Sequence, residues 1–395
     1  MATAQLDLAD SVSRYARTYH DLIGECHHVA SPLGAWLLLA LCAPAATGDE
    51  LSWVLGCDAA QAADLAGGLL ADPHPLVAAA AAVWYRPGKA DPRWLAGLPA
   101  SVEQGPVPGQ AGLDDWVRRH TFGLVDRFPV RADRLSYLLL ASALATKVSW
   151  DCPFELAPGS ALGGSSPWAQ RLTHVLRAPG HPGHRAFVAV TPQAGDVAVH
   201  IGRARGGLLV ASVAAAPEVA QGDVLAAAHG VAIAQALGHP VPARSLFDLP
   251  LGDGPLWSVA EEMSADGGGE RCVAYLPAWS AQSEHDLTDP RLGFAAAAAA
   301  LGHGDPWQAR QAVTARYTRV GFEAAAVTAM ATMLSMRRSR RALLRTAELR
   351  FGHPYAVVAV TADEDSGPRR PVATPSPWHG IPVFSAWVAE PREAG

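Results

Sequence analysis

A run of small residues near the C-terminus, followed at once by arginines, constrains this chain more than any other feature. Residues Gly321–Leu334 read Gly-Phe-Glu-Ala-Ala-Ala-Val-Thr-Ala-Met-Ala-Thr-Met-Leu, and arginines occupy positions 337, 338, 340 and 341. The segment can be an exposed loop, a helix, or a strand that inserts into a sheet. Glu323–Arg350 lacks Gly and Pro and is rich in strong helix formers, so periodicity alone favours an amphipathic basic helix.

The chain is long and apolar enough to bury a large core. It has 395 residues, of which 50% are hydrophobic and 17% are charged. A net charge of −6 argues against a nucleic-acid-binding face, which would need to be basic. The five cysteines show no CxxC spacing and indicate free thiols in a reducing compartment. Met1–Asp10 shows no signal-peptide pattern, so a cytoplasmic location is expected.

The first third of the chain is predicted to be helical. Apolar residues recur at three- and four-residue spacing between Leu8 and Leu22 and form one face. Ser31-Pro32 is typical of a helix start, where the hydroxyl caps free amides and the proline needs none. Ala35–Ala43 is apolar on all sides, which places that helix in the core. Further helices are expected over Asp49–Leu55, Asp58–Leu70 and Leu113–Phe128.

Strand patterns dominate the rest of the chain. Leu135–Trp150 is apolar almost throughout, which is typical of a strand buried on both faces. Shorter β-like segments follow from Arg185 onward, separated by Gly and Pro. The pattern predicts one large α+β unit with helices first and sheets afterwards. The other expected strands are Ala79–Tyr85, Arg185–Val190, Val197–Arg203, Leu208–Ala214, Cys272–Trp279, Tyr355–Thr361 and Ile381–Val388.

The sequence carries no common catalytic signature. HExxH, GxSxG, GxxxxGK[ST] and a GxGxxG after a strand are all missing. Cys26-His27-His28 could ligate a metal, but no second ligand cluster stands at zinc spacing, so surface or packing histidines are the preferred interpretation. We therefore expect no enzyme activity, no cofactor and no metal.

Four stretches of the chain occur together, in this order, in one known family. They are Ser31–Leu33 with Leu37–Ala43 and Gly48–Leu51; Asp115–Val117 with Thr121–Val125; Ser142–Trp150 with Pro153-Phe154; and Gly321–Thr328 with His353–Tyr355 and Pro382–Val388. Through these four stretches the chain resembles the serpins, a family of serine protease inhibitors. It is similar to a divergent, bacterial-type member of that family. The resemblance implies an α+β serpin fold: a single domain over residues 8–391 with three β-sheets, about nine α-helices and an exposed C-terminal reactive loop. The hinge and loop would cover residues 321–350.

The resemblance also implies a mechanism that needs a metastable fold. A protease cleaves the loop and forms an acyl-enzyme, and it is trapped when the freed segment inserts as a new middle strand of the main sheet. Strand geometry then places Ala324, Ala326 and Thr328 on the inward face and Glu323 on the other. The implied hinge consists of Gly321, Phe322, Glu323, Ala324, Ala325, Ala326, Val327 and Thr328.

Phe322 departs from the family pattern, because the family usually has a small residue at this inward position. Overpacking typically costs about 1–3 kcal/mol. A new central strand adds hydrogen bonds worth roughly 1 kcal/mol each, so insertion is expected to remain favourable. A slow insertion, however, would leave the protein cut as an ordinary substrate.

The residues that resemble the family's sheet-opening cluster are Ser31, Ser142 and Gln311. Ser31 matches the family, Ser142 stands where asparagine is usual, and Gln311 replaces the usual histidine. An ion pair of the family is also missing, because its positions hold Arg319 and Ala278. Loss of both members leaves no unpaired buried charge.

The scissile bond has several candidates. Counting forward from the hinge gives Ser335–Met336, and counting back from Pro354 gives a bond within Arg340–Leu343. Arg338–Ser339 lies between them and is preferred, since an arginine fits the acidic specificity pocket of a trypsin-like protease. Paired arginines also suit a basic-specific subtilase.

The expected partner is thus a serine protease, with the chain itself a monomer that binds neither nucleic acid nor membrane. An alternative follows from Phe322 and the altered sheet-opening cluster. The chain would then be a non-inhibitory serpin-fold protein that binds a ligand or a partner. By analogy with the family, an extracellular location is a second expectation.

Overall fold

Several of the helices pack against one buried helix, α2 (Pro32–Cys42). Ten of its 11 residues are buried, because it packs against α1 (Ala2–Ile23), α4 (Ala59–Ala71) and two strands. The predicted helix start is confirmed. The predicted cap is wrong: the Ser31 side chain makes no capping bond, since its hydroxyl donates to the carbonyl of Val383 at 3.0 Å.

This computed structural model describes residues 2–131, 138–264, 268–302, 307–322, 342–363 and 376–395. These ranges hold eight α-helices. None of the helices in the described ranges is long and apolar enough to cross a bilayer. The other helices are α3 (Glu50–Leu55), α5 (Pro92–Gly97), α6 (Gln110–His120), α7 (Gln221–Ala236) and α8 (Phe294–Ala300).

Helix α6 is shorter than predicted. The expected helix ran to Phe128, whereas α6 ends at His120. Phe122 and Gly123 follow with φ of 52° and 72°, a left-handed backbone that cannot continue an α-helix. The segment after α6 therefore forms a turn.

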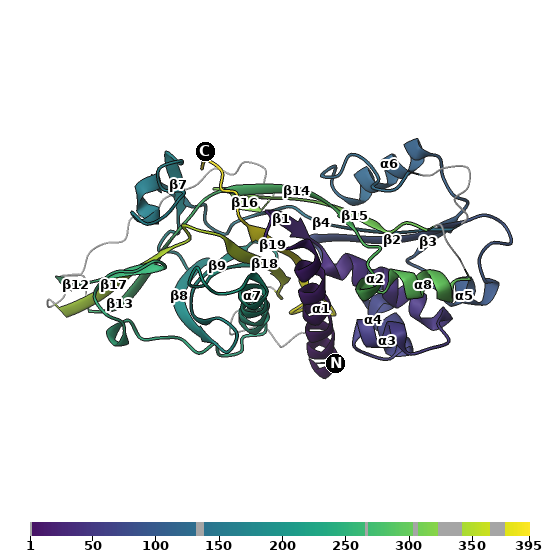
Figure 1. Cartoon of the computed structure of the whole chain (residues 1–395), viewed down its shortest axis with the longest axis horizontal. Helices are drawn as coiled ribbons and strands as arrows, with labels where there is room; N and C mark the ends of the chain where they lie inside the picture. The colour runs from purple at the N-terminus through teal and green to yellow at the C-terminus, as the bar shows by residue number, and fades with distance from the viewer. Residues whose placement is uncertain (1, 132–137, 265–267, 303–306, 323–341, 364–375) are drawn as a thin grey trace.

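A six-stranded antiparallel sheet forms the middle of the molecule (Figure 1). All residues of β10, β18 and β19 are buried, because α7 covers one face and the main core covers the other. This explains the apolar runs in the sequence. The strands, in sheet order, are β1 (His28–Ala30), β19 (Pro382–Val388), β18 (Tyr355–Thr361), β10 (Leu208–Ala214), β9 (Gly195–Ala204) and β8 (His184–Thr191).

A second six-stranded sheet lies at one end of the molecule, away from α2 (Figure 1). It contains β17 (Ala342–Arg350), so the helix that periodicity favoured over Glu323–Arg350 is wrong for this part. Residues 323–341 lie outside the described ranges. The other strands, in sheet order around β17, are β11 (Gly252–Asp253), β12 (Trp257–Ser264), then β13 (Gly269–Leu276), β7 (His174–Arg177) and β6 (Glu155–Pro158).

The remaining strands form one sheet that is split along its length. β4 (Leu138–Thr146) continues after Lys147 as β5 (Val148–Ser149), and this shared strand joins two hydrogen-bonded halves. The predicted strand Leu135–Trp150 is confirmed from Leu138 to Ser149 with a break at Lys147, and residues 135–137 lie outside the described ranges. Burial on both faces is wrong for β4, because its alternate residues are only half-buried. Counted this way, the described residues form three sheets. One half is β3 (Glu103–Gly105), β2 (Val77–Tyr85) and β4; the other is β14 (Trp279–Asp286), β15 (Arg310–Tyr317), β16 (Gly321–Phe322) and β5.

Candidate functional site

The chain reverses direction between β15 and β16 in a tight turn. The backbone N–H and the hydroxyl of Thr318 both donate to the carbonyl of Gly321, at 2.9 and 3.0 Å. Trp150 holds the turn from outside: its backbone N–H donates to the Val320 carbonyl at 3.1 Å, and its indole N–H donates to the Thr318 carbonyl at 3.0 Å. The turn is therefore fixed to the segment that follows β5.

After this turn, β16 begins a strand between the two halves of the split sheet. Gly321 lies opposite Ser149, and Phe322 lies opposite both Val148 of β5 and Tyr317 of β15, antiparallel on each side. A segment inserted after this turn would have to run in this direction. Of the predicted hinge, the described residues contain only Gly321 and Phe322. Glu323–Thr328 lie outside them.

Phe322 is buried beneath the sheet, which confirms the prediction that it lies on the inward face. Its side chain is 3% exposed. The ring meets Trp279 edge-on, with centroids 6.2 Å apart, and Trp279 in turn stacks on Tyr317 at 6.0 Å. The large side chain thus packs into an aromatic group at the head of the split, and it anchors the first residues of the hinge.

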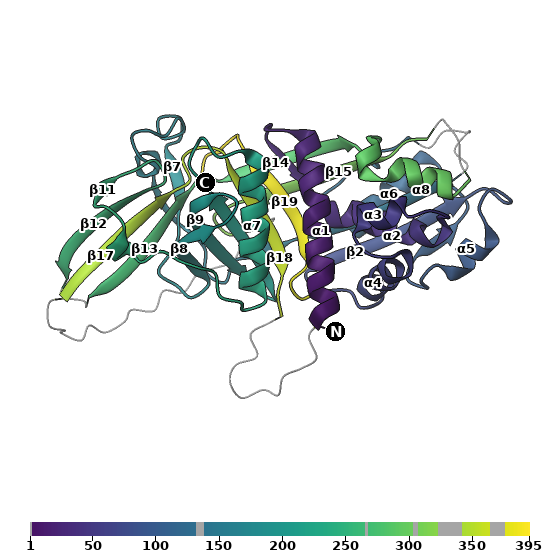
Figure 2. The same ribbon diagram turned by 60° about the horizontal axis from the view of Figure 1, so that its bottom comes forward.

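Below β16, no hydrogen bond of the described sheets joins β4 to β15. Among the described strands, β4 pairs with β2 and, below Tyr317, β15 pairs with β14, so each of the two has an edge with no described partner. Figure 2 shows β14, β15 and β2 in the same layer. A cavity between them is lined by Leu144–Thr146, Ala312–Ala315 and, after α6, Thr121, Leu124 and Val125. The buried hydroxyl of Thr146 has no hydrogen-bond partner among the residues that the structure describes. Open edges on two sides of one cavity can bind an extended strand.

The predicted sheet-opening cluster lies beyond this cavity, further from β16 along β4 and β15. The Ser31 N–H donates to Oε1 of Gln311 at 3.0 Å, and Nε2 of Gln311 donates to the Ser31 carbonyl at 2.8 Å. The Ser142 hydroxyl donates to the Gly34 carbonyl at 2.7 Å. A Cβ on Gly34 would lie 3.3 Å from the Ser31 hydroxyl oxygen and 3.4 Å from that of Ser142. The structure therefore brings the three residues together, but Ser142 and Gln311 each bond to the backbone around the start of α2.

A row of buried histidines adjoins this cluster, and the sequence analysis did not identify it. Tyr19 donates its hydroxyl to Oε1 of Gln311 at 3.0 Å. His28 Nδ1–H donates to the Cys26 carbonyl at 2.8 Å, so its Nε2 accepts from His20 Nδ1–H at 2.7 Å. The other nitrogen of His20 then accepts from the Ser385 hydroxyl at 2.6 Å. Each proton in the row therefore has a fixed position.

Burial keeps these histidines neutral. It lowers the pKa of His28 to about 4 and that of His20 well below its ordinary value, because a charged imidazole loses its hydration there. His28 is 2% exposed, so the packing interpretation of the Cys26-His27-His28 motif is confirmed for this residue. The described residues contain no group of three or more metal-ligating side chains. The contact between His20 and His28 leaves no pattern in the sequence, because it depends on tertiary packing.

The candidate scissile residues Ser335, Met336, Arg338 and Ser339 lie outside the described ranges. The structure fixes only the two ends of the segment that holds them, at Phe322 and Ala342. Arg319 and Ala278, at the positions of the missing ion pair, are both described. Their carbonyls accept bonds from the backbone N–H of Phe154 and Arg392, at 2.9 and 2.7 Å.

No family model and no curated protein sequence matches this chain, but solved structures match nearly all of it. The thermophilic serpin tengpin, in its native state, aligns with a TM-score of 0.65 at 11% identity, over 97% of this chain and 93% of its own. Human thyroxine-binding globulin complexed with thyroxine gives 0.65 at 13% identity, over 99% of both chains. AtSerpin1 of Arabidopsis, in its native stressed conformation, gives 0.60 at 13%, over 98% of both. The chain has the serpin fold, as its sequence predicted.

The histidine row predicts a loss of stability in acid. A histidine whose pKa is lowered in the folded state binds fewer protons than in the unfolded state, whose pKa is about 6.5. Its contribution is therefore intact above pH 6.5 and falls as the pH drops toward 4, the region of the folded pKa of His28. Unfolding temperatures measured from pH 8 to pH 4 at one scan rate should decline below pH 6.5.

His28→Gln supplies a donor and an acceptor that do not titrate, so it should flatten part of this decline. Replacement of the exposed His239 by glutamine is the matched control, and it should leave the pH profile unchanged. An equal profile for wild type and His28→Gln would show that this histidine does not contribute to the acid sensitivity.

Proposed function

We propose that this chain is a serine protease inhibitor that acts as a suicide substrate. A protease would cleave the segment between β16 and β17, and the freed part would insert into the split sheet. The observation that carries the proposal is the position of β16. Gly321 and Phe322 already lie as a strand between β15 and β5, directly above the two open edges of β4 and β15.

The register of β16 defines a partner for each residue that would follow it. Phe322 lies opposite Tyr317 and Val148. Continued without a bulge, the same register brings Ala329 opposite Arg310 at the start of β15 and Thr332 opposite Leu138 at the start of β4. The new ladder would run the full length of both strands. At roughly 1 kcal/mol net per hydrogen bond, it outweighs any single misfit along the way.

The inward side chains of the inserted strand would be small where space is limited. Ala324 and Ala326 follow Phe322 on the same face, because alternate residues of a strand share one face. The register brings Ala324 opposite Thr146 and Ala315 and next to the cavity they line. The aromatic residue would thus remain at the head of the split, where Trp279 and Tyr317 already surround it.

Thr328 has the most specific position in this arrangement. The same register brings it opposite Ser142 on one side and Gln311 on the other, in the sheet-opening cluster. Its hydroxyl can both donate and accept, and both neighbours carry polar groups on that face. The threonine would complete a polar group that now bonds only to backbone around α2 and to Tyr19.

The chemical step belongs to the protease. Its serine oxygen attacks the carbonyl carbon of Arg338, the preferred scissile residue. The C–N bond to Ser339 breaks, the new amine takes a proton, and an acyl ester joins Arg338 to the protease. Insertion would carry the ester toward the far end of β15 before water hydrolyses it. We propose a trypsin-like protease or a basic-specific subtilase as the target, because both accept arginine before the scissile bond.

A ligand- or partner-binding protein of serpin fold is the second candidate. Two observations favour it: the aromatic residue packed at the hinge, and the similarity in fold to thyroxine-binding globulin, whose structure holds thyroxine. In that case cleavage of the segment would not lead to insertion. The same experiment separates the two candidates.

Mixing the chain with trypsin should yield a band that survives SDS, with the summed mass of the protease and the fragment that ends at the scissile residue, because the fragment after the cut is not covalently bound. The chain cut without trapping should unfold on the order of 10 °C higher than the intact chain, because the new ladder adds on the order of 10 kcal/mol. Trypsin whose catalytic serine is replaced by alanine is the control and should form no such band. Clean cleavage with active trypsin left over and an unchanged unfolding temperature would favour the second candidate.

Thr328→Arg should prevent trapping without preventing cleavage. The substitution would bury a charge between Ser142 and Gln311 during insertion, while the scissile bond lies further along the exposed segment. We expect the number of inhibitor molecules consumed per trypsin molecule trapped to rise at least tenfold. Thr328→Ser keeps the hydroxyl and should behave as wild type. Equal trapping by the arginine variant would contradict the register given above.

A further inference from the structure

The strand that follows the loop, β17, is held between two strands that are neighbours in sequence. β12 pairs with β17 antiparallel along its whole length, Trp257–Ser264, and β13 pairs with it parallel over Gly269–Tyr275. β12 and β13 are joined by only four residues, 265–268, a length typical of a hairpin whose strands pair with each other. Here β17 lies inside that hairpin, with a hydrogen-bonded ladder on each side.

Two arginines of β17 add side-chain bonds on the β12 side. The Arg345 guanidinium, 15% exposed, contacts Glu261 of β12 at 2.7 Å and donates to the carbonyl of Leu246 at 2.8 Å. The guanidinium of Arg350, 13% exposed, contacts Asp253 of β11 at 3.1 Å and the hydroxyl of Ser258 at 2.9 Å. Removing β17 from the sheet would leave these partners without their charge-assisted bonds.

Gly268, the residue before β13, lies close to the start of β17. A Cβ on Gly268 would lie 2.7 Å from both the Cβ of Ala342 and the carbonyl oxygen of Leu343. Real Cβ atoms do not approach so closely, so glycine is needed for this crossing. The start of β17 therefore packs directly against the first described residue before β13.

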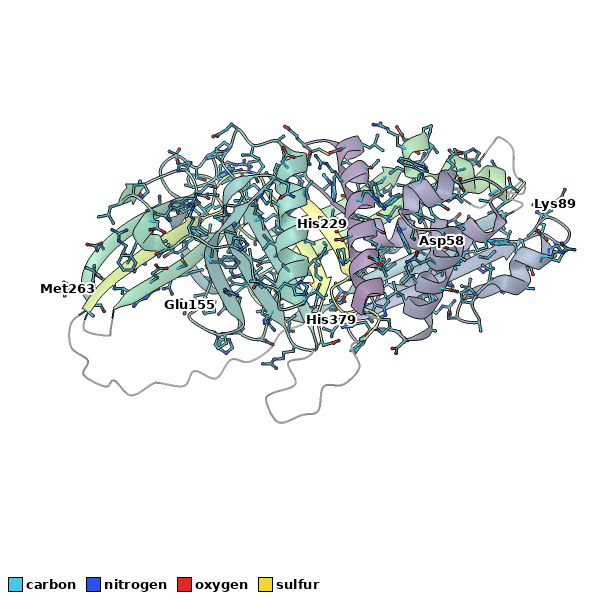
Figure 3. All side chains as sticks on the ribbon, turned by 90° about the horizontal axis from the view of Figure 1, so that it is seen from below. Asp58, Lys89, Glu155, His229, Met263 and His379 are labelled. Carbon is cyan, nitrogen blue, oxygen red and sulfur yellow. The ribbon has the colours of Figure 1, made fainter. Side chains whose placement is uncertain are left out.

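Chain length makes β17 the obstacle to insertion of an uncut loop. If residues up to Ala329 inserted, the 12 residues 330–341 would have to return from the far end of β15 to Ala342, and they reach at most about 43 Å. β15 has eight residues and β17 has nine, or about 26 and 30 Å. The two strands follow one another along the long axis (Figure 1), and Figure 3 shows Met263, which pairs with Leu343, at the very end of the molecule.

We propose that β12 is a clamp that retains β17 and thereby keeps the uncut loop out of the split sheet. The gap of about 55 Å exceeds the reach of the free residues, so complete insertion requires either cleavage of the loop or release of β17. Release must break the ladders to both β12 and β13. That the retention of β17 prevents insertion of the uncut loop rests on the proposed function. The retention of β17 by β12 can be measured independently.

Alternate residues of β12 direct their backbone groups toward β17 and away from it. Proline substitutions at two neighbouring residues therefore form a matched pair of variants. The Leu256 carbonyl accepts from the N–H of Arg350 at 2.7 Å, whereas the Trp257 carbonyl accepts from Gly254 on the other side at 2.8 Å. By alternation, the N–H of Glu262 points toward β17 and that of Met263 points toward the open edge. Both side chains are exposed. Glu262→Pro therefore removes a bond to β17, and Met263→Pro does not.

The first measurement is hydrogen exchange of the β17 amides in the intact proteins. Glu262→Pro should raise the exchange rate across β17 at least tenfold, with β9 and β10 unchanged, while Met263→Pro should match wild type. Equal exchange in the two variants overturns the clamp. Because no cleavage is involved, this result does not depend on whether the chain inhibits a protease.

The second measurement tests the consequence for insertion. Uncut proteins are incubated below their unfolding temperature, and monomers that become resistant to subsequent heating are counted. Glu262→Pro should form them at least tenfold faster than Met263→Pro, and equal rates overturn the clamp. If wild type cut by trypsin gains no heat resistance, the proposed function itself fails, and the exchange measurement alone then decides whether β12 retains β17.

Discussion

The open edges of β4 and β15 are the constraint on which the rest of this structure depends. Backbone N–H and C=O groups in a protein interior need partners, and an unpaired strand edge accepts any extended chain that can reach it. Here the edges share a cavity that the turn after α6 covers, and the Thr146 hydroxyl beside it has no partner among the described residues. One strand, β4–β5, joins the two halves, so the halves can take up a further strand while remaining connected.

The two ends of the loop are held with very different strength. At β16 the described residues give two paired positions, Gly321 and Phe322, and Trp150 and Trp279 fix the turn and the ring. At the other end, β17 has a ladder on both sides and two arginines bonded to neighbouring elements. A cut between the two ends would therefore leave the part attached to β16 free to move, and β17 would stay in place. Under the proposed function, this asymmetry would direct insertion from Phe322 toward the start of β15.

How far the sequence predicts this structure depends on the range of the interactions involved. The strand over Ser142–Ser149 follows the prediction, because an apolar run is a local signal. The hydroxyl of Ser31 bonds to Val383 and not to its own helix, and His20 contacts Ser385. Both partners are remote in sequence and leave no periodic trace. Ala342–Arg350 has the composition of a helix, but pairing with β12 and β13 overrides that propensity.

The departures from the family pattern acquire a different meaning once the contacts are known. Ser142 and Gln311 both bond to the backbone around α2, so neither side chain connects β4 to β15 across the split. A strand that inserted between Ser142 and Gln311 would therefore break no side-chain hydrogen bond across the split. Breaking each such bond would cost roughly 1 kcal/mol. Phe322, the other departure, is buried against Trp279 before any insertion begins. Its packing therefore belongs to the starting structure, and the residues that would have to move are the small ones that follow it.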